Sequence, residues 1–426
     1  MAGNQANYDV VVIGGGPAGA TCGALVAAAG HRTLIVERER FPRFHIGESL
    51  MPETYWTFKR LGLVPKLKES GFVKKYSVQF VNASGKESAP FYFDEMNPHE
   101  SSQTWQVLRS DFDQMMIDNA VEKGAEVWQE TIVSEVLFDG VAAGRGHRLP
   151  RAEGVVVRRR DGSTQRVGAK VVVDATGTSA LISNRLGIRD ADPMLRKAAV
   201  FAHYRGAARE PDPRDAGATL VLALENQDGW FWYIPLPDDI VSVGVVADVD
   251  YLIKGRGTPE TILQEEIRRC PAIVPRLTNA ARVSPVHVLK DYSYGATRCA
   301  GDGWVLIGDA FTFLDPIYSS GVFLALNSGE RAADAIDTAL KANDPSAERL
   351  GAWGENFYAG VQNIRKLVYA FYTKDFSFGQ FNREHPEFKK NLVDLLVGDV
   401  FKPEAGEIFT VMGRKIPLPE PLRLAN

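Results

Sequence analysis

A glycine-rich segment near the N-terminus has the residue types and spacing of a phosphate-binding turn. Residues 14–19 read Gly-Gly-Gly-Pro-Ala-Gly. Gly14 permits a tight turn, Gly16 permits close approach of a pyrophosphate, and Gly19 permits close packing of a helix. Ala18 lies at the start of that helix, whose free N–H groups favour phosphates. Glu37 ends the next apolar run, where an acid binds a ribose hydroxyl. The pattern predicts a dinucleotide site and by itself leaves NAD and FAD both open.

Two adjacent lysines, Lys74 and Lys75, follow the sequence Gly71-Phe72-Val73. If this segment is a strand, the two side chains point to opposite faces, so only one of them can face the interior. A desolvated lysine has a lowered pKa and can act as a base or as a hydrogen-bond donor near neutral pH. The pair therefore predicts one buried lysine and one that faces solvent.

The elements that would position these groups are those of an α/β protein. Apolar strands at 8–13 and 33–36 flank a small-residue helix, which predicts a parallel sheet. Asp161-Gly162 predicts a hairpin between 155–160 and 165–172. Residues 196–205 and 218–248 are rich in strand formers, a long helix is expected at 319–341, and residues from 346 onward are mostly helical. Because strands of two sheets alternate along the chain, we expect discontinuous domains.

Composition excludes several functional classes. The chain has 426 residues, 49 Lys and Arg against 53 Asp and Glu, and a net charge of −4, which gives no case for nucleic acid. Three distant cysteines predict neither disulfides nor a zinc site, and the histidines show no metal spacing, so no metal is expected. No apolar run is long enough to span a membrane, and no signal peptide is recognisable. We expect a cytoplasmic protein.

Several later segments resemble the fingerprints of FAD-dependent monooxygenase-like proteins. They are Asp174-Ala175-Thr176-Gly177 and the run from Trp304 to Ala310. The loop Phe41-Pro42-Arg43 with Gly47-Glu48-Ser49 resembles the segment beside the isoalloxazine in these proteins. The resemblance implies FAD rather than NAD as the bound dinucleotide. The further cofactor contacts that it implies are Arg38, Arg43, Ser49, Arg109 (pyrophosphate), Asp309 (ribityl or phosphate), Pro316 and Gly321.

Two strings are more specific and make the chain similar to flavin-dependent halogenases. Residues 230–235 match W-x-W-x-I-P, and residues 313–321 match F-x-x-P-x-x-S-x-G. The resemblance implies that Trp230 and Trp232 keep the substrate away from the flavin and that Ser320 and Gly321 bind the halide. It also implies that Lys75, rather than Lys74, carries or polarises hypohalous acid.

The same resemblance implies an architecture and a reaction. The fold would be a Rossmann-like FAD-binding domain interrupted by a β-sheet substrate domain of the aromatic-hydroxylase type, with a helical C-terminal region. The expected FAD-binding domain comprises 1–75, 105–195 and 285–345, the substrate domain 76–104 and 196–284, and the helical region 346–426. The expected reaction is halogenation by FADH2, O2 and chloride or bromide, with FADH2 delivered by an external flavin reductase.

The expected substrate class follows from one position at which this sequence differs from tryptophan halogenases. Tryptophan halogenases have a glutamate immediately before the Ser-small-Gly turn, and this chain has Tyr318 there. The chain therefore resembles the branch that acts on phenols and pyrroles, free or tethered to a carrier protein. Three alternatives remain open here: an aromatic hydroxylase that takes NAD(P)H directly, a reductase of isoprenoid double bonds, and a flavin-binding module without turnover. A pocket sealed by the C-terminal helices would favour the last of these.

Overall fold

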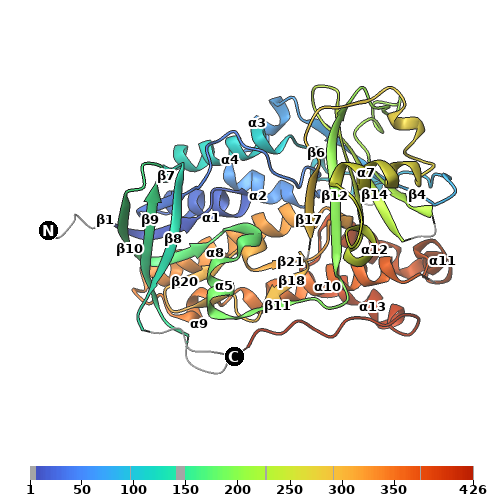
Figure 1. Ribbon diagram of the computed structural model, residues 1–426. Coiled ribbons are helices and arrows are strands. Elements are labelled where there is room, and N and C mark those ends of the chain that lie inside the picture. The colour runs from blue at the N-terminus through green and yellow to red at the C-terminus, as the bar shows by residue number, and fades with distance from the viewer. Residues whose placement is uncertain are drawn as a thin grey trace.

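The computed structural model describes residues 6–95, 97–140, 149–225, 228–290, 292–374 and 376–425. Two large β-sheets lie next to each other, and the C-terminal helices run beneath the second sheet (Figure 1). The α/β class and the FAD-binding type of fold predicted from the sequence are confirmed.

The first sheet has eight strands and is built around the N-terminal βαβ unit. Its main path runs β19-β20-β10-β1-β2-β7, and β8 and β9 continue from β10. Strands β7, β2, β1, β10 and β20 are parallel, and β9 and β10 form the expected antiparallel hairpin. The strand bounds are β1 (Ala6–Ile13), β2 (Thr33–Val36), β7 (Glu126–Trp128), β8 (Thr131–Phe138), β9 (Ala152–Arg159), β10 (Thr164–Asp174), β19 (Ala300–Gly301) and β20 (Trp304–Leu306).

Helices pack on this sheet because its central strands are apolar on both faces. Val10, Val11, Val12 and Val172 are all fully buried, as expected for a parallel sheet covered on each side. Helix α1 (Pro17–Ala28) contacts α4 (Arg109–Glu122) and α8 (Ser320–Lys341). Three shorter helices are α2 (Thr54–Leu61), α3 (Val64–Glu69) and α5 (Leu181–Leu186).

The second large sheet also has eight strands, in the order β16-β12-β15-β14-β13-β4-β5 with β17 paired to β12. The strands are β4 (Ser77–Val81), β5 (Phe91–Tyr92), β12 (Lys197–Arg205), β13 (Thr219–Ala223), β14 (Gly229–Pro235), β15 (Ile240–Asp248), β16 (Ala281–Arg282) and β17 (His287–Lys290). Strand β17 pairs with β12, so residues 287–290 join this sheet and not the first one.

The two faces of this sheet pack in different cores. Along β14, Trp230 and Trp232 belong to the core shared with the first sheet, whereas Phe231 and Tyr233 face the opposite way. This alternation is the two-residue period of a strand. Helices α6 (Val249–Leu252) and α7 (Pro259–Arg268) cover the outer face.

Smaller elements join the two halves. Strands β3 (Val73–Lys75) and β6 (Thr104–Gln106) form a two-stranded sheet, and β11 (Arg189–Ala191), β18 (Tyr294–Ala296) and β21 (Thr312–Phe313) form a three-stranded one. The C-terminal part contains α9 (Ala347–Leu350), α10 (Gly354–Tyr372), α11 (Phe378–Glu384), α12 (Lys389–Val397) and α13 (Ile408–Met412). In the described part of the chain, no helix combines the length and apolarity needed to cross a membrane.

Candidate active site

The glycine turn between β1 and α1 has the close contacts that the sequence predicts. Gly14 has a φ of +106°, and a Cβ there would lie 2.4 Å from the carbonyl oxygen of Ala175. A Cβ on Gly19 would lie 2.0 Å from the carbonyl oxygen of Gly14. At Gly16, by contrast, the nearest atom to an added Cβ is Arg43 Nη2 at 3.7 Å. The turn is therefore tight at its base and open where a phosphate would approach the start of α1.

Glu37 directly follows β2 and turns its carboxylate toward this turn. Its side chain is buried, and the backbone N–H of Gly15 donates to Oε2 at 2.8 Å. The N–H of Glu39 donates to Oε1 at 2.9 Å. Glu37 is thus fixed beside the glycine turn, where the sequence predicts a ribose-binding acid.

Two arginines predicted to bind the cofactor share one buried carboxylate. Asp113 accepts from Arg43 Nη1 at 2.9 Å and from Arg109 Nε and Nη2 at 2.8 and 3.0 Å. Arg109 Nη1 also donates to the carbonyl oxygens of Ile46 and Gly47. Arg43 Nη2 also lies 3.7 Å from Glu37 Oε2, which places Arg43 next to the glycine turn. Arg109 is held beside Arg43 because both arginines bind Asp113.

The segment containing Asp309 approaches the same place from β20. A Cβ on Gly308 would lie 2.9 Å from Ala18 Cβ, so the turn before Asp309 packs against the first turn of α1. Burial raises the pKa of the Asp309 carboxyl to about 7, against the opposing charge of Arg109. Gly47 is similarly close to Arg109 and to Val322 of α8. The predicted cofactor residues from four separate segments therefore meet at one site.

Arg38 lies apart from these groups. Its side chain is 65% exposed and lies 3.5 Å from Glu39. It lines a surface hollow of about 380 Å³ whose other lining residues are Glu39, Arg40, Glu130, Ile132, Arg158, Arg159 and Arg160. The structure thus places Arg38 beside the end of β2 and outside the glycine turn.

The lysine pair lies on β3 as the strand pattern predicts. Lys74 is exposed, and Lys75 is only 4% exposed. Lys75 Nζ donates to Ser49 Oγ at 2.8 Å and to the carbonyl oxygen of Leu50 at 3.1 Å. Burial lowers the pKa of Lys75 from its usual range to about 7. An amine in this state exchanges a proton readily near neutral pH.

Trp230 and Trp232 lie on the inner face of β14 with ring centroids 6.3 Å apart. Trp230 Nε1 donates to Tyr372 Oη at 3.0 Å, and Trp232 Nε1 donates to Ser242 Oγ at 3.1 Å. Phe371 of α10 also contacts Trp230 edge-on. The first tryptophan is therefore covered by the C-terminal helix α10, and the second by the substrate sheet itself.

The predicted halide turn connects β21 to α8. Asp315 Oδ1 accepts from the N–H of Ile317 at 3.0 Å and thereby closes the short turn that starts at Pro316. Ser320 is buried at the first position of α8, and a Cβ on Gly321 would lie 3.2 Å from the ring of Phe313. Tyr318 is also buried and donates its hydroxyl hydrogen to the carbonyl oxygen of Leu367.

Asp315 links this turn to the tryptophans. Its Oδ2 accepts from the hydroxyl of Tyr372 at 3.0 Å, and that hydroxyl accepts from Trp230. Burial raises the pKa of Asp315 to about 7, although the Ile317 N–H and the Tyr372 hydroxyl oppose the shift. A continuous hydrogen-bonded chain thus runs from an indole of β14 through α10 to the halide turn.

Sequence reasoning missed several buried polar residues around Lys75. Ser49 Oγ lies 3.0 Å from Thr219 Oγ1, and Gln106 Nε2 donates to the same Thr219 oxygen at 2.9 Å. Glu48 Oε1 lies 2.6 Å from His203 Nε2, across a sequence separation of 155 residues. The motif Gly47-Glu48-Ser49 was recognised in the sequence, but no local pattern connects Glu48 with a histidine on β12.

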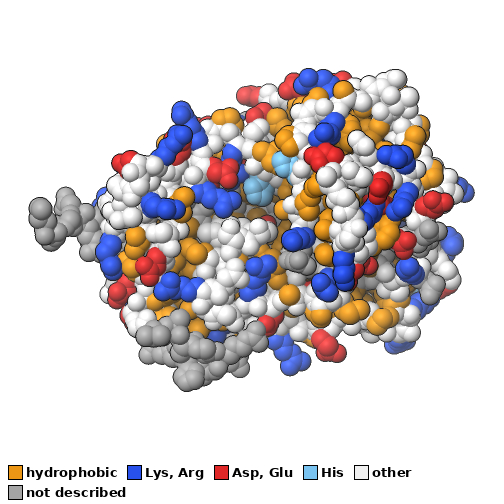
Figure 2. Space-filling model, viewed as in Figure 1, with side chains coloured by type: hydrophobic (Ala, Val, Ile, Leu, Met, Phe, Trp, Pro, Cys, Tyr) orange, Lys and Arg blue, Asp and Glu red, His pale blue; other side chains and the backbone are white. Residues whose placement is uncertain are grey.

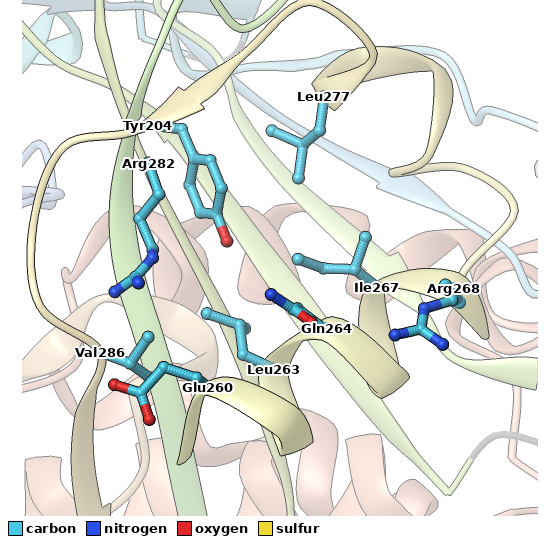
Figure 3. A pocket seen from close by; sticks show the side chains of 9 residues that line it. All are labelled: Tyr204, Glu260, Leu263, Gln264, Ile267, Arg268, Leu277, Arg282 and Val286. Atoms are coloured by element: carbon cyan, nitrogen blue, oxygen red, sulfur yellow. The ribbon is translucent and has the colours of Figure 1, made fainter. Parts of the chain in front are cut away.

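A separate hollow of about 290 Å³ lies on the outer face of the substrate sheet (Figure 3). Leu263, Gln264 and Ile267 of α7 point into it opposite Tyr204 of β12, with Arg282 and Val286 at one side. It contains no residue that the sequence predicts to be functional. The predicted site lies on the other, inner face of this sheet.

The comparisons with known proteins agree with this geometry. A family model described as an FAD binding domain matches residues 7–346. A 1H-pyrrole-2-carbonyl-(peptidyl-carrier protein) brominase of Pseudoalteromonas luteoviolacea is 33% identical over 420 residues, covering 96% of each chain. The corresponding chlorinase of Pseudomonas fluorescens is 32% identical over 427 residues, covering 95% of this chain and 92% of the relative. The chain belongs to the flavin-dependent halogenases.

Solved structures support the same assignment. The flavin-dependent brominase Bmp2 superposes with a TM-score of 0.84 at 33% identity, covering 96% of this chain and 98% of its own. The myxobacterial chondrochloren halogenase CndH gives a TM-score of 0.78 at 32% identity, covering 99% of this chain and 100% of its own. The halogenase prediction is confirmed, and the comparisons do not favour the hydroxylase, reductase and non-catalytic alternatives.

The site's residues fit FAD, which this flavin-dependent halogenase uses together with a halide and O2. Gly16 leaves space at the start of α1, and Arg43 and Arg109 supply positive charge beside it. These groups suit a pyrophosphate. When bound and reduced, FAD supplies with O2 the oxidising equivalents that convert a halide into an electrophilic halogen.

Proposed function

We propose that this halogenase brominates or chlorinates an electron-rich aromatic ring. The ring is the pyrrole of a pyrrole-2-carbonyl group that is tethered to a peptidyl-carrier protein. The two relatives that match nearly the whole chain carry that substrate in their names. The chain also has Tyr318, and not a carboxylate, before the Ser-small-Gly turn. An electron-rich ring undergoes electrophilic substitution without a dedicated acid at that position.

The observation that best supports this proposal is Lys75, a buried amine that is held at a defined place. Its Nζ is fixed by Ser49 Oγ and the Leu50 carbonyl, and no described carboxylate pairs with it. We infer that this group receives hypohalous acid, as a haloamine or through a hydrogen bond that polarises the halogen. Lys74 faces solvent and serves neither role.

Other roles in the proposal follow from position. Trp230 and Trp232 close the inner face of β14 and would separate the substrate from the flavin. Ser320 and Gly321, at the start of α8, would bind the halide through backbone N–H groups. The residues that would contact FAD are Gly14, Gly16, Ala18, Gly19, Glu37, Arg43, Ser49, Arg109, Asp309, Pro316 and Gly321. Arg38 is not included, because its side chain is exposed and lies outside the glycine turn.

The proposal includes an external flavin reductase and a cytoplasmic location, where NADH is available to it. The sequence contains no second G-x-G-x-x-G segment for a nicotinamide cofactor. We also propose that residues 1–75, 105–195 and 291–345 form the FAD-binding unit. Residues 76–104 and 196–290 would then form the substrate unit, and 346–426 the helical region.

The deciding experiment combines the protein with FAD, NADH, a generic flavin reductase, bromide and a carrier-bound pyrrole-2-carbonyl thioester. We expect a bromine isotope doublet in the product mass that requires the reductase. Lys75→Ala should abolish this product while FAD affinity stays within about twofold, and Lys74→Ala should retain most of the rate.

Two results would contradict the proposal. A gain of one oxygen that needs NADH but no reductase would make the protein a hydroxylase. Full bromination by Lys75→Ala would remove the assigned role of the lysine. Free phenols and pyrroles assayed in parallel distinguish a tethered from a free substrate.

A further inference from the structure

Glu48 differs from three other buried carboxylates around the site, Glu37, Asp113 and Asp315, in having an oxygen without a partner among the described residues. Its side chain is 1% exposed, Oε1 lies 2.6 Å from His203 Nε2, and Oε2 has no hydrogen-bond partner among the described residues. In the other cases both oxygens are engaged: Glu37 by the N–H groups of Gly15 and Glu39, Asp113 by Arg43 and Arg109, and Asp315 by the Ile317 N–H and Tyr372.

A buried carboxylate oxygen is stable only when it receives a hydrogen bond. The described protein groups supply none to Oε2, so this oxygen is free to accept a hydrogen bond from a bound molecule. His203 Nε2 contacts Oε1, and the backbone of His203 is held in place: its N–H donates to Ser284 Oγ at 2.9 Å, and its carbonyl accepts from the Val283 N–H.

Glu48 lies between the two groups assigned to the chemistry. The next residue, Ser49, holds Lys75 Nζ. On the other side, His203 pairs across β12 and β15 with Ser242, the acceptor of the Trp232 indole N–H. Both polar links lie in the inner layer between the two large sheets. Figure 2 shows histidine side chains at the surface near the middle of this face of the molecule.

We propose that Glu48 Oε2 accepts a hydrogen bond from the ring N–H of the aromatic substrate, with His203 holding Oε1 in place. This inference rests on the proposed function. Such a bond orients the ring relative to Lys75 and stabilises the positive charge that develops on the ring as the halogen adds. Glu48 makes and breaks no covalent bond in this role. Tryptophan halogenases have a glutamate at the position of Tyr318, and this chain has none there. Glu48, from a different part of the chain, provides a carboxylate that can accept from a substrate N–H.

The test compares the pyrrole-2-carbonyl carrier thioester with its N-methyl counterpart. We expect wild-type protein to prefer the N–H substrate by at least about tenfold in kcat/KM, a typical worth for one charge-assisted hydrogen bond. In Glu48→Gln the amide oxygen faces His203, so an NH2 group replaces Oε2 and the preference should fall to about twofold. Glu266→Gln, a buried carboxylate of α7 bonded to Tyr251 and Arg256, should keep the full preference.

A second variant and a binding measurement complete the test. His203→Leu leaves Glu48 in the chain but frees its carboxylate, and should lower the preference to about threefold. An unchanged preference in both Glu48→Gln and His203→Leu would overturn the inference. So would an unchanged preference with FAD affinity reduced tenfold or more, since the donor would then be the flavin. If wild-type protein halogenates neither thioester, the proposed substrate fails instead.

Discussion

At the scale of single residues, the unusual group is a lysine buried without a counter-charge. Lys75 Nζ is bonded to one hydroxyl and one carbonyl and lies 5.4 Å from the ring of Phe93, and no described carboxylate pairs with it. Desolvation alone lowers its pKa to about 7. Such an amine costs stability, which indicates a role in chemistry rather than in folding.

The cost should be visible as a pH dependence of stability. Between about pH 7 and pH 10.5 the unfolded lysine is protonated and the folded one is neutral, so unfolding takes up a proton. The free energy of unfolding of the wild-type protein should therefore rise with pH across this window, by about 1.4 kcal/mol for each pKa unit of difference.

Lys75→Met removes this effect. Its advantage in melting temperature over the wild type should be largest below pH 7 and should shrink as the pH approaches 10.5. Thermal melts of both proteins across this range measure the difference. A difference that does not vary with pH would mean that the lysine keeps its ordinary pKa in the folded state.

At the scale of elements, the turn between β1 and α1 depends on the absence of side chains. The Cβ of an alanine at Gly19 would meet the backbone oxygen of Gly14 at 2.0 Å, and backbone atoms cannot move aside cheaply. Gly71, which precedes β3, has no neighbour within 4 Å of an added Cβ and no positive φ. The two glycines therefore provide a matched pair.

Gly19→Ala should lower the free energy of unfolding by about 2–3 kcal/mol and weaken FAD binding at least tenfold, because the helix start must shift. Gly71→Ala should change stability by less than about 0.5 kcal/mol. Urea unfolding and fluorescence titration with FAD measure the two effects. Equal effects of the two substitutions would show that close packing at the turn is unimportant.

At the scale of the whole molecule, the site is completed by segments from the entire chain. Trp230 comes from the substrate sheet, Tyr372 from α10 and Asp315 from the turn before α8, and they form one hydrogen-bonded chain. The C-terminal helices extend beneath the substrate sheet in Figure 1 and contribute to the site through this contact. The contact covers Trp230, so α10 forms part of the candidate site as well as stabilising the fold.

Tyr372→Phe should leave the Trp230 N–H and one Asp315 oxygen buried without partners. We expect a loss of about 2–3 kcal/mol in the free energy of unfolding, since each unpaired buried group costs about 1–3 kcal/mol. Tyr204→Phe, whose hydroxyl has no hydrogen bond among the described residues, is the control and should be nearly neutral. Chemical denaturation of both variants makes the comparison, and an equal loss in the two would contradict it.

The sequence by itself determined the local features of this protein. The βαβ unit with its glycine turn, the position of Glu37, the hairpin at Asp161-Gly162 and the burial of one of the two lysines 74 and 75 follow from short-range patterns, because strand and helix periodicity fix which side chains share a face. The family resemblance selected Lys75 as the buried one. The motifs at 230–235 and 313–321 indicated the protein family.

Only the tertiary structure decided the contacts that cross between segments. Glu48 meets His203, Trp230 meets Tyr372, and Arg43 shares Asp113 with Arg109. The pairing of β17 with β12 likewise brings two distant segments into one sheet. These contacts join residues from 70 to 155 positions apart, except for Arg109 and Asp113. Periodicity carries no information over such distances, so sheet order and helix packing alone bring the partners together.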